Sequence, residues 1–364
     1  MLKIRYSVQI VSLIMILYAE VAVATPTRAD RSVDAAHASS SSELHPVETS
    51  VLCVGDIMLV GSAKPIIEQH GVDYPFDGMR AIIATADIAI GNLEMPLGLT
   101  GAPIPEKDFT FIGKPQLARG IANAGFDVLA LANNHMGDYG DDALLQTLEV
   151  LSANKLRYCG AGPDLQTARQ PAIMKSRNVH IAVLAYSKTY PFEFFAGEGD
   201  PGTVNGIAEI FVPDIRAARE RANLVVVSFH WSGELVTEPR EYQEWLGKLA
   251  IDAGADLVFG HHPHVLQGIE VYKGKIIAYS LGDFVFGSGS ESKHTGAILR
   301  VTFKNGETKR GEIIPINVDN REVQFQPRTF SGDAARAAIN EIRTLSQKWG
   351  TEIIAEENVG IIKL

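Results

Sequence analysis

Five short apolar runs dominate the hydrophobic pattern of this chain. They are rich in Val, Ile, Leu or Ala, each is followed by polar residues or glycine, and they cover residues 51–54, 86–90, 128–132, 224–229 and 256–259. Continuous apolar runs of this length are typical of strands buried on both faces of a sheet. Because ligands bind at the carboxyl ends of strands in open α/β sheets, we expect the polar residues after these runs to gather in one place.

Helical patterns fill the gaps between the runs. Apolar residues recur at helical spacing over residues 114–125, 141–153 and 241–254. Strands that alternate with helices up to about residue 265 predict a layered α/β fold. Beyond this point the pattern predicts mainly strands and then a final amphipathic helix, over residues 268–272, 275–279, 296–303, 311–318, 323–327 and 333–348.

The first residues have the pattern of a targeting segment. Two basic residues precede an apolar stretch over residues 10–19, and the small residues Ala22-Val23-Ala24 follow it. The stretch is short for a membrane span, so we predict a signal peptide over residues 1–24, with an uncleaved anchor as the alternative. A flexible Ser/Ala-rich linker is predicted over residues 25–48. The protein is therefore expected to be exported: periplasmic, secreted or attached to the outer face of the cytoplasmic membrane.

Composition narrows the possible partners. The chain has 364 residues, 46% of them hydrophobic and 21% charged, which is ordinary for a globular domain with a large core. A net charge of −10 without a basic patch argues against nucleic acid. The same charge repels a polyanionic polymer unless a metal or a local basic pocket intervenes. The only cysteines, Cys53 and Cys159, fit either a disulfide or two buried thiols.

The candidate chemistry starts from a histidine cluster. His261, His262 and His264 lie within four positions, directly after the run over residues 256–259. Imidazole is the commonest side-chain metal ligand, and a loop at a strand end can direct two rings at one point. The alternative is a polar loop whose histidines bind nothing. The other runs lead into residues able to bind metal or move protons: Asp56, Asn92, Glu94, Asn134, His135 and His230.

The order of these motifs resembles the CapA family, also called the poly-γ-glutamate synthesis accessory family, within the calcineurin-like metallophosphoesterase superfamily. The motifs are Gly55-Asp56, Gly91-Asn92-Leu93-Glu94, Asn133-Asn134-His135, His230-Trp231 and Gly260-His261-His262-Pro263-His264. The similarity spans about residues 49–290. It implies an αββα sandwich, the calcineurin-like metallophosphatase fold. The hydrophobic pattern predicts that C-terminal strands and a helix over residues 291–364 complete this domain.

The resemblance also implies roles for individual residues. His135 would be the proton donor to a leaving group, and one or two divalent ions (Mn, Zn or Fe) would be bound. The implied metal ligands are Asp56, Asn92, Glu94, Asn134, His230, His262 and His264. Three neighbours would support them: Glu234, Asp283 and His261, which could also replace His262 as ligand.

Two positions depart from the superfamily pattern. Met58 stands where a histidine ligand is usual, and Asn92 stands where an aspartate usually bridges two ions. Thioether sulfur is a poor ligand for such cations, and an amide has no charge with which to bridge them. Glu94, two residues after Asn92, can supply the missing carboxylate or can form a salt bridge elsewhere.

Two functions follow from the resemblance. The first is an accessory protein for the synthesis, export or anchoring of a capsule or envelope polymer, poly-γ-glutamate or a related polyglutamine-type polymer. Its partners would be membrane-bound synthesis and export subunits and the anionic amino-acid polymer. The alternative is an active metal-dependent hydrolase or phosphoesterase of the cell envelope. The departures at Met58 and Asn92 favour the accessory role, whereas the other ligand candidates favour the enzyme. The chain has no phosphate-binding Gly-rich loop, nucleophile elbow or dinucleotide fingerprint.

Overall fold

The computed structural model describes residues 48–287 and 294–364. The predicted signal peptide and all but the last residue of the predicted linker lie outside the described residues. Within the described part of the chain, no helix is both long and apolar enough to span a bilayer.

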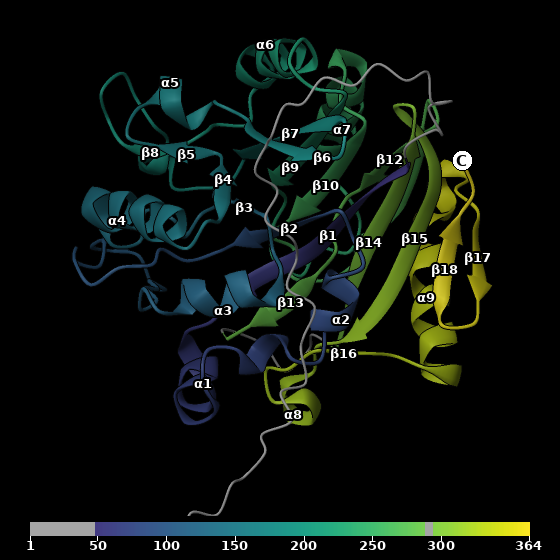
Figure 1. Cartoon of the computed structure of the whole chain (residues 1–364), viewed down its shortest axis with the longest axis horizontal. Helices are drawn as coiled ribbons and strands as arrows, with labels where there is room; N and C mark the ends of the chain where they lie inside the picture. Colours follow the sequence, from purple (N-terminus) through teal and green to yellow (C-terminus); the bar gives the residue numbers. More distant parts are fainter. Residues whose placement is uncertain (1–47, 288–293) are drawn as a thin grey trace, which may run out of the picture. The chain divides into compact units, whose positions relative to one another are not determined.

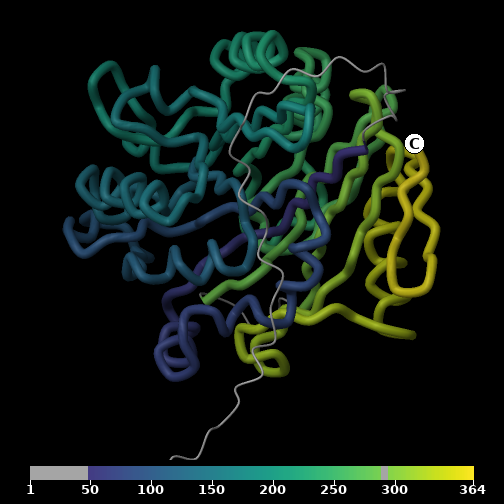
Figure 2. Tube along the Cα trace, in the orientation of Figure 1, coloured from purple at the N-terminus to yellow at the C-terminus, as the bar shows by residue number. Residues whose placement is uncertain are grey.

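The first sheet is centred on β1 (Glu48–Met58). On one side β1 pairs in parallel with β2 (Ile88–Leu93), and β3 (Val128–Ala130) and β4 (Arg157–Cys159) follow in order. On the other side the strands are antiparallel (Figures 1 and 2), and they comprise β14 (Thr295–Lys304), β15 (Glu307–Asn317), β18 (Val359–Ile362) and β17 (Ile353–Glu356). Two short additions complete this sheet, β13 (Asp283–Phe286) beside β1 and β16 (Arg328–Thr329) beside β15.

The second sheet has a parallel centre and antiparallel edges. Its parallel strands are β12 (Lys275–Ala278), β10 (Leu257–His261), β9 (Leu224–His230) and β7 (Val179–Ser187). Its edges are β11 (Ile269–Tyr272) and β6 (Ala172–Ser176). A small separate ribbon pairs β5 (Ala161–Gly162) with β8 (Gly202–Thr203).

Helices cover the outer faces of both sheets (Figure 1). The first sheet packs against α1 (Lys64–His70), α2 (Arg80–Ile83), α3 (Leu117–Ala124) and α4 (Gly140–Ala153). The second packs against α6 (Ala208–Arg219) and α7 (Glu241–Ala253). The remaining helices are α5 (Leu165–Ala168), α8 (Asn320–Val323) and α9 (Gly332–Ser346).

The side chains of β1 show how the layers are held together. Leu52 and Val54 pack among the helices, whereas Val51 and Cys53 belong to the core between the two sheets. Successive strand residues point to opposite faces, so a continuous apolar run buries both faces of the sheet. The predicted αββα sandwich is therefore confirmed. Both cysteines are buried free thiols, Cys159 also lying in this inner core.

One predicted strand is wrong. Residues 323–327 were expected to form a strand, but Val323 ends α8, and Gln324 and Phe325 have φ of 50° and 63°. The side chain of Asp319 caps α8 by accepting a hydrogen bond from Arg321 N at 3.0 Å. A capped helical turn followed by left-handed residues does not fit an extended strand.

Candidate metal centre

Asp56 lies near the carboxyl end of β1, fully buried, with strands on both sides. It is opposite Asn92 of β2 and Asp283 of β13, and the pairing register shifts next to it on each side. Such irregularities are common beside functional sites, where they redirect a side chain. A Cβ atom on Gly55 would lie 1.9 Å from the carbonyl oxygen of Gly282, so only glycine fits at this close approach.

Glu94 lies at the centre of the cluster and is also fully buried. Its Oε1 is 3.6 Å from His230 Nε2 and 3.7 Å from His264 Nε2. Asn92 Nδ2 donates to Asp56 Oδ1 at 2.9 Å and lies 3.4 Å from Glu94 Oε2. Glu94 is thus in a position to supply the carboxylate that Asn92 lacks.

The histidines come from the neighbouring ends of β9 and β10, where His230 is opposite His261. The chain then turns sharply, with φ of 92° at His262 and 56° at His264. Left-handed conformations at non-glycine residues are strained, and they concentrate at ligand sites. The turn places His264 Nδ1 2.9 Å from Asp283 Oδ1 and 3.4 Å from an oxygen of Asp56.

These side chains can hold divalent cations. Three sets have ligand atoms within 4.8 Å of one another: Asp56, Glu94 and His230; Glu94, His262 and His264; and Asp56, His264 and Asp283. Pairs of these sets share Glu94, Asp56 or His264, as expected where two ions lie close together. Imidazole nitrogens and carboxylate oxygens suit Mn, Zn and Fe.

His261 provides a further test of this fit. Its side chain is buried, and neither ring nitrogen makes a hydrogen bond of acceptable geometry. Nδ1 nevertheless lies 2.7 Å from Asp56 Oδ1. Buried polar atoms without hydrogen bonds cost free energy, and an ion bound by this ring would offset that cost, although none of the three ligand sets above includes His261.

The charge states of Asp56 and His230 agree with metal binding, whereas His264 must release a proton before it can bind an ion. Burial raises the pKa of Asp56, but His261 and His264 outweigh it and hold that pKa well below the usual value. Burial, reinforced by His262, lowers the pKa of His230 well below its usual value. For His264, burial lowers the pKa, but the negative charges of Glu94 and Asp283 raise it by more than burial lowers it. The pKa of His264 therefore lies well above its usual value. At neutral pH the centre thus offers the Asp56 carboxylate and a neutral His230 imidazole as ligands.

Asn134 and His135 follow β3 and reach the same centre. Asn134 Oδ1 is 2.7 Å from His230 Nε2. His135 Nδ1 is 2.8 Å from Asp138 Oδ2, so Nε2 takes no part in that contact. Burial lowers the pKa of His135, and Asp138 offsets only part of that effect.

Lys107 and Asp138 are functional candidates to which the sequence interpretation gave no role. The Lys107 ammonium forms an ion pair with the buried Asp138 carboxylate, donates to the carbonyl oxygen of Asn134 at 2.6 Å and lies 3.2 Å from His135 Nδ1. Phe111 N also donates to Asp138 at 2.8 Å. Asp138 could have been found from its spacing, three residues after His135. Lys107 lies outside the helices and strands and gave no signal.

Asn133 is a third residue to which the sequence interpretation gave no role. It connects the segment after β3 to β2. Its Nδ2 donates to Asn92 Oδ1 at 3.1 Å and to the carbonyl oxygen of Leu93 at 2.8 Å. Its Oδ1 accepts a hydrogen bond from His135 N at 3.1 Å. Asn133 thereby fixes the position of His135 relative to β2.

Two positions lie away from the centre. Met58 is buried in the core against the helices, so its side chain does not replace the missing histidine. Glu234 is exposed, and no hydrogen bond or ion pair among the described residues joins it to the cluster. Asp283, by contrast, contacts His264 directly, as expected for a supporting residue.

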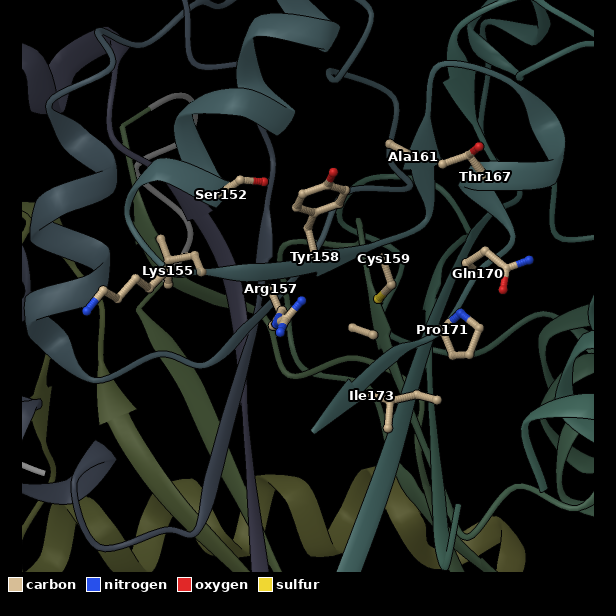
Figure 3. A pocket seen from close by; sticks show the side chains of 12 residues that line it. Ser152, Lys155, Arg157, Tyr158, Cys159, Ala161, Thr167, Gln170, Pro171 and Ile173 are labelled. Atoms are coloured by element: carbon tan, nitrogen blue, oxygen red, sulfur yellow. The ribbon is translucent and has the colours of Figure 1, made fainter. Parts of the chain in front are cut away.

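The centre adjoins a cavity of about 380 Å³ that His262 lines. A separate groove of about 550 Å³ lies at the sheet edges between β4 and β6 (Figure 3). Tyr158, Cys159 and Ile173 are among the residues lining this groove, and none of the predicted site residues is. The cavity beside His262 thus adjoins a candidate metal ligand, whereas the groove does not.

Comparison with known proteins identifies the family. The family model described as bacterial capsule synthesis protein PGA_cap matches residues 50–288, so the chain belongs to this family. It is 33% identical to the capsule biosynthesis protein CapA of Bacillus anthracis, over 78% of this chain and 70% of that protein. It is 35% identical to the PGA biosynthesis protein CapA of Bacillus subtilis, over 73% and 70%. A probable polyglutamine synthesis accessory protein of Mycobacterium tuberculosis is 26% identical, over 77% and 78%.

Proposed function

We propose that this protein is an exported accessory component of capsule or envelope polymer synthesis, and that its buried centre binds one or two divalent ions. The polymer role is supported by the relatives, which are named for capsule, PGA and polyglutamine synthesis. The metal is supported by one observation above all: in each of three overlapping sets, buried carboxylate and imidazole ligand atoms lie within 4.8 Å of one another. The partners proposed are membrane-bound synthesis or export subunits and the anionic amino-acid polymer.

The residues that would hold the ions are Asp56, Glu94, His230, His262 and His264, with Asn92 and Asn134 beside them and Asp283 orienting His264. Divalent ions bound there would polarise a carbonyl or phosphoryl oxygen and lower the pKa of a bound water. Asp138 accepts from His135 Nδ1 and so orients the ring, while Lys107 holds Asp138 in place. When the ring is doubly protonated, His135 Nε2 would donate a proton to a leaving group, and its lowered pKa makes that imidazolium a stronger acid.

The second candidate function is an active metal-dependent hydrolase of the envelope. The arrangement of Lys107, Asp138 and His135 favours it, because a structural metal site needs no oriented proton donor. The buried Met58 and the uncharged Asn92 favour the accessory role. We propose the accessory role as the main function, since both positions depart from what two-metal catalysis requires.

Complementation of a deletion strain separates the two functions. His135→Ala removes the proton donor and leaves Asn134 in place, and general acid–base groups contribute about 10²- to 10⁴-fold in rate. For an accessory protein, this variant should restore envelope polymer to the wild-type amount. His180→Ala, at an exposed position in β7, is the matched control.

Metal content and location must be measured for the same variants. Loss of polymer with His135→Ala, in a protein that keeps its metal, fold and location, would replace the accessory role by the hydrolase. Polymer made normally by both His135→Ala and a metal-free ligand variant supports a role in assembly alone.

A further inference from the structure

The cavity beside the metal centre lies at the carboxyl ends of β7, β9 and β10. Its wall includes His262 and, from the segment after β7, Lys188, Thr189 and Tyr190. Lys188 N donates to the carbonyl oxygen of His230 at 2.7 Å, so this wall is attached directly to a proposed metal ligand. A molecule in the cavity would therefore lie next to the centre.

Two cations line this cavity. Lys188 and Arg240 have exposed side chains, and neither forms an ion pair with any described residue. The chain as a whole carries a net charge of −10, so two unpaired cations together are a local exception to its charge. Positive groups in a concave site raise the local concentration of anions and steer them inward.

A neutral donor adds to the two charges. Ser232 also lines the cavity, with φ of 78°, and its buried hydroxyl has no hydrogen-bond partner among the described residues. Ser232 N donates to the hydroxyl of Tyr242 at 2.6 Å, which fixes the backbone in this conformation. Buried hydroxyl groups are normally hydrogen-bonded, so a ligand oxygen would complete this one.

The rim of the cavity is aromatic. Tyr190 lines the cavity and is 72% exposed, and the neighbouring Phe192 is 57% exposed; their rings meet edge to face with centroids 4.5 Å apart. Exposed aromatic rings offer a surface for carbon chains and flat amide groups. An inorganic anion would contact the cations but would gain nothing from the aromatic rings. A chain with carboxylate side groups would contact both the rings and the cations.

We propose that this cavity binds a carboxylate-bearing amino-acid chain, with Arg240 and Lys188 holding one or two of its carboxylates. The planar guanidinium of Arg240 suits a two-point contact with a carboxylate, and the Lys188 ammonium contributes a point charge. The chain's backbone lies across the aromatic rim and leads toward the metal centre. This inference rests on the proposed function and names the ligand class and the residues that bind it.

Direct binding measurements test the inference without requiring polymer synthesis. The full-length, metal-loaded protein is titrated with short γ-linked glutamate oligomers by calorimetry, and separately with inorganic phosphate. Arg240→Gln and Lys188→Gln should each weaken oligomer binding about tenfold, a typical effect of losing one charge-assisted contact. Lys309→Gln, at a surface lysine paired with Glu307, should leave binding unchanged. Arg240→Lys should recover part of the affinity lost in Arg240→Gln.

The outcomes separate this inference from the proposed function. Weaker oligomer binding with unchanged metal content and melting temperature supports the carboxylate site, even if complementation fails. Wild-type affinity in the double variant Lys188→Gln/Arg240→Gln overturns it. Binding of phosphate without binding of the oligomer also overturns it, because the cavity would then serve phosphate chemistry.

Discussion

At the scale of single residues, His264 connects the parts of the proposed metal centre. It lies 2.9 Å from Asp283 of β13, 3.4 Å from Asp56 of β1 and 3.7 Å from Glu94, which follows β2. Without His264, the three carboxylates would lose the imidazole that lies between them, whether that ring is protonated or bound to a metal ion. The backbone of His264 has a positive φ, and the surrounding contacts stabilise this strained conformation.

We predict that His264→Ala lowers the divalent metal content of the purified protein and its melting temperature. Each tenfold loss of metal affinity removes about 1.4 kcal/mol of stabilisation, because binding free energy is linked to folding. Substituting a buried side chain lowers stability even without metal, so the deciding measurement is the effect of a chelator. Chelation should lower the melting temperature of the wild type and of His180→Ala, and should change that of His264→Ala far less. Equal chelator effects in all three proteins would argue against a metal ligand at His264.

The residues at strand ends were the predictable part of this centre. Asp56, Glu94, His230 and His264 follow or end buried apolar runs, and parallel strands bring their carboxyl ends together. Lys107 could not be predicted in this way, because it lies in a segment without periodic pattern. Its contact with Asp138 depends on how that segment folds over the sheet, which local sequence does not specify.

At the scale of secondary structure elements, Asp87 joins the two sheets. It precedes β2, and its carboxylate accepts hydrogen bonds from Ser50 N and Ser50 Oγ of β1, both at 2.9 Å. It also accepts one from Ser176 Oγ of β6, at 3.0 Å. Burial raises the pKa of Asp87, but these hydrogen bonds and the nearby Arg177 outweigh it, so its pKa lies below the usual value.

This lowered pKa predicts a pH-dependent stability. Because the folded-state pKa is lower than that of the unfolded chain, ~3.9, the contribution is complete above that pH and is lost as pH falls through the folded value. We expect Asp87→Asn to reduce the free energy of unfolding by about 1–2 kcal/mol at neutral pH and by less in acid. Urea unfolding across this pH range measures the difference, with the exposed Asp200→Asn as control. A difference between Asp87→Asn and wild type that stays constant with pH would contradict the charge-based explanation.

Elements with a regular apolar pattern were predicted, whereas α6 and several short elements were not. The helical patterns over residues 114–125, 141–153 and 241–254 correspond to α3, α4 and α7, because many apolar positions define each of them. The segment 323–327 failed because a capping side chain and two left-handed residues outweigh a few apolar positions. The hairpin β17–β18 was missed because its strands have four residues each and join the sheet only through β18, which pairs with β15.

At the scale of the whole molecule, charge and location must suit a polyanionic ligand. The net charge of −10 repels such a ligand at long range. Only a local group of cations or a bound metal makes the electrostatic potential positive at a binding site. The proposed metal centre and the cavity with Lys188 and Arg240 provide both, next to each other. Under the proposed function, this region must lie where the polymer is made or exported.

We predict that residues 1–24 direct the folded domain across the cytoplasmic membrane. Two basic residues, a short apolar stretch and small residues near position 24 form the pattern that export machinery recognises. A reporter enzyme whose folding requires disulfide formation, fused after Leu364, should be active in cells, because such bonds form only outside the reducing cytoplasm. The same fusion without residues 1–24 should accumulate but remain inactive. A reporter that works only in the cytoplasm, fused at the same point, should show little signal with the full chain. Full cytoplasmic signal from that fusion would show that the domain stays inside the cell, away from an envelope polymer.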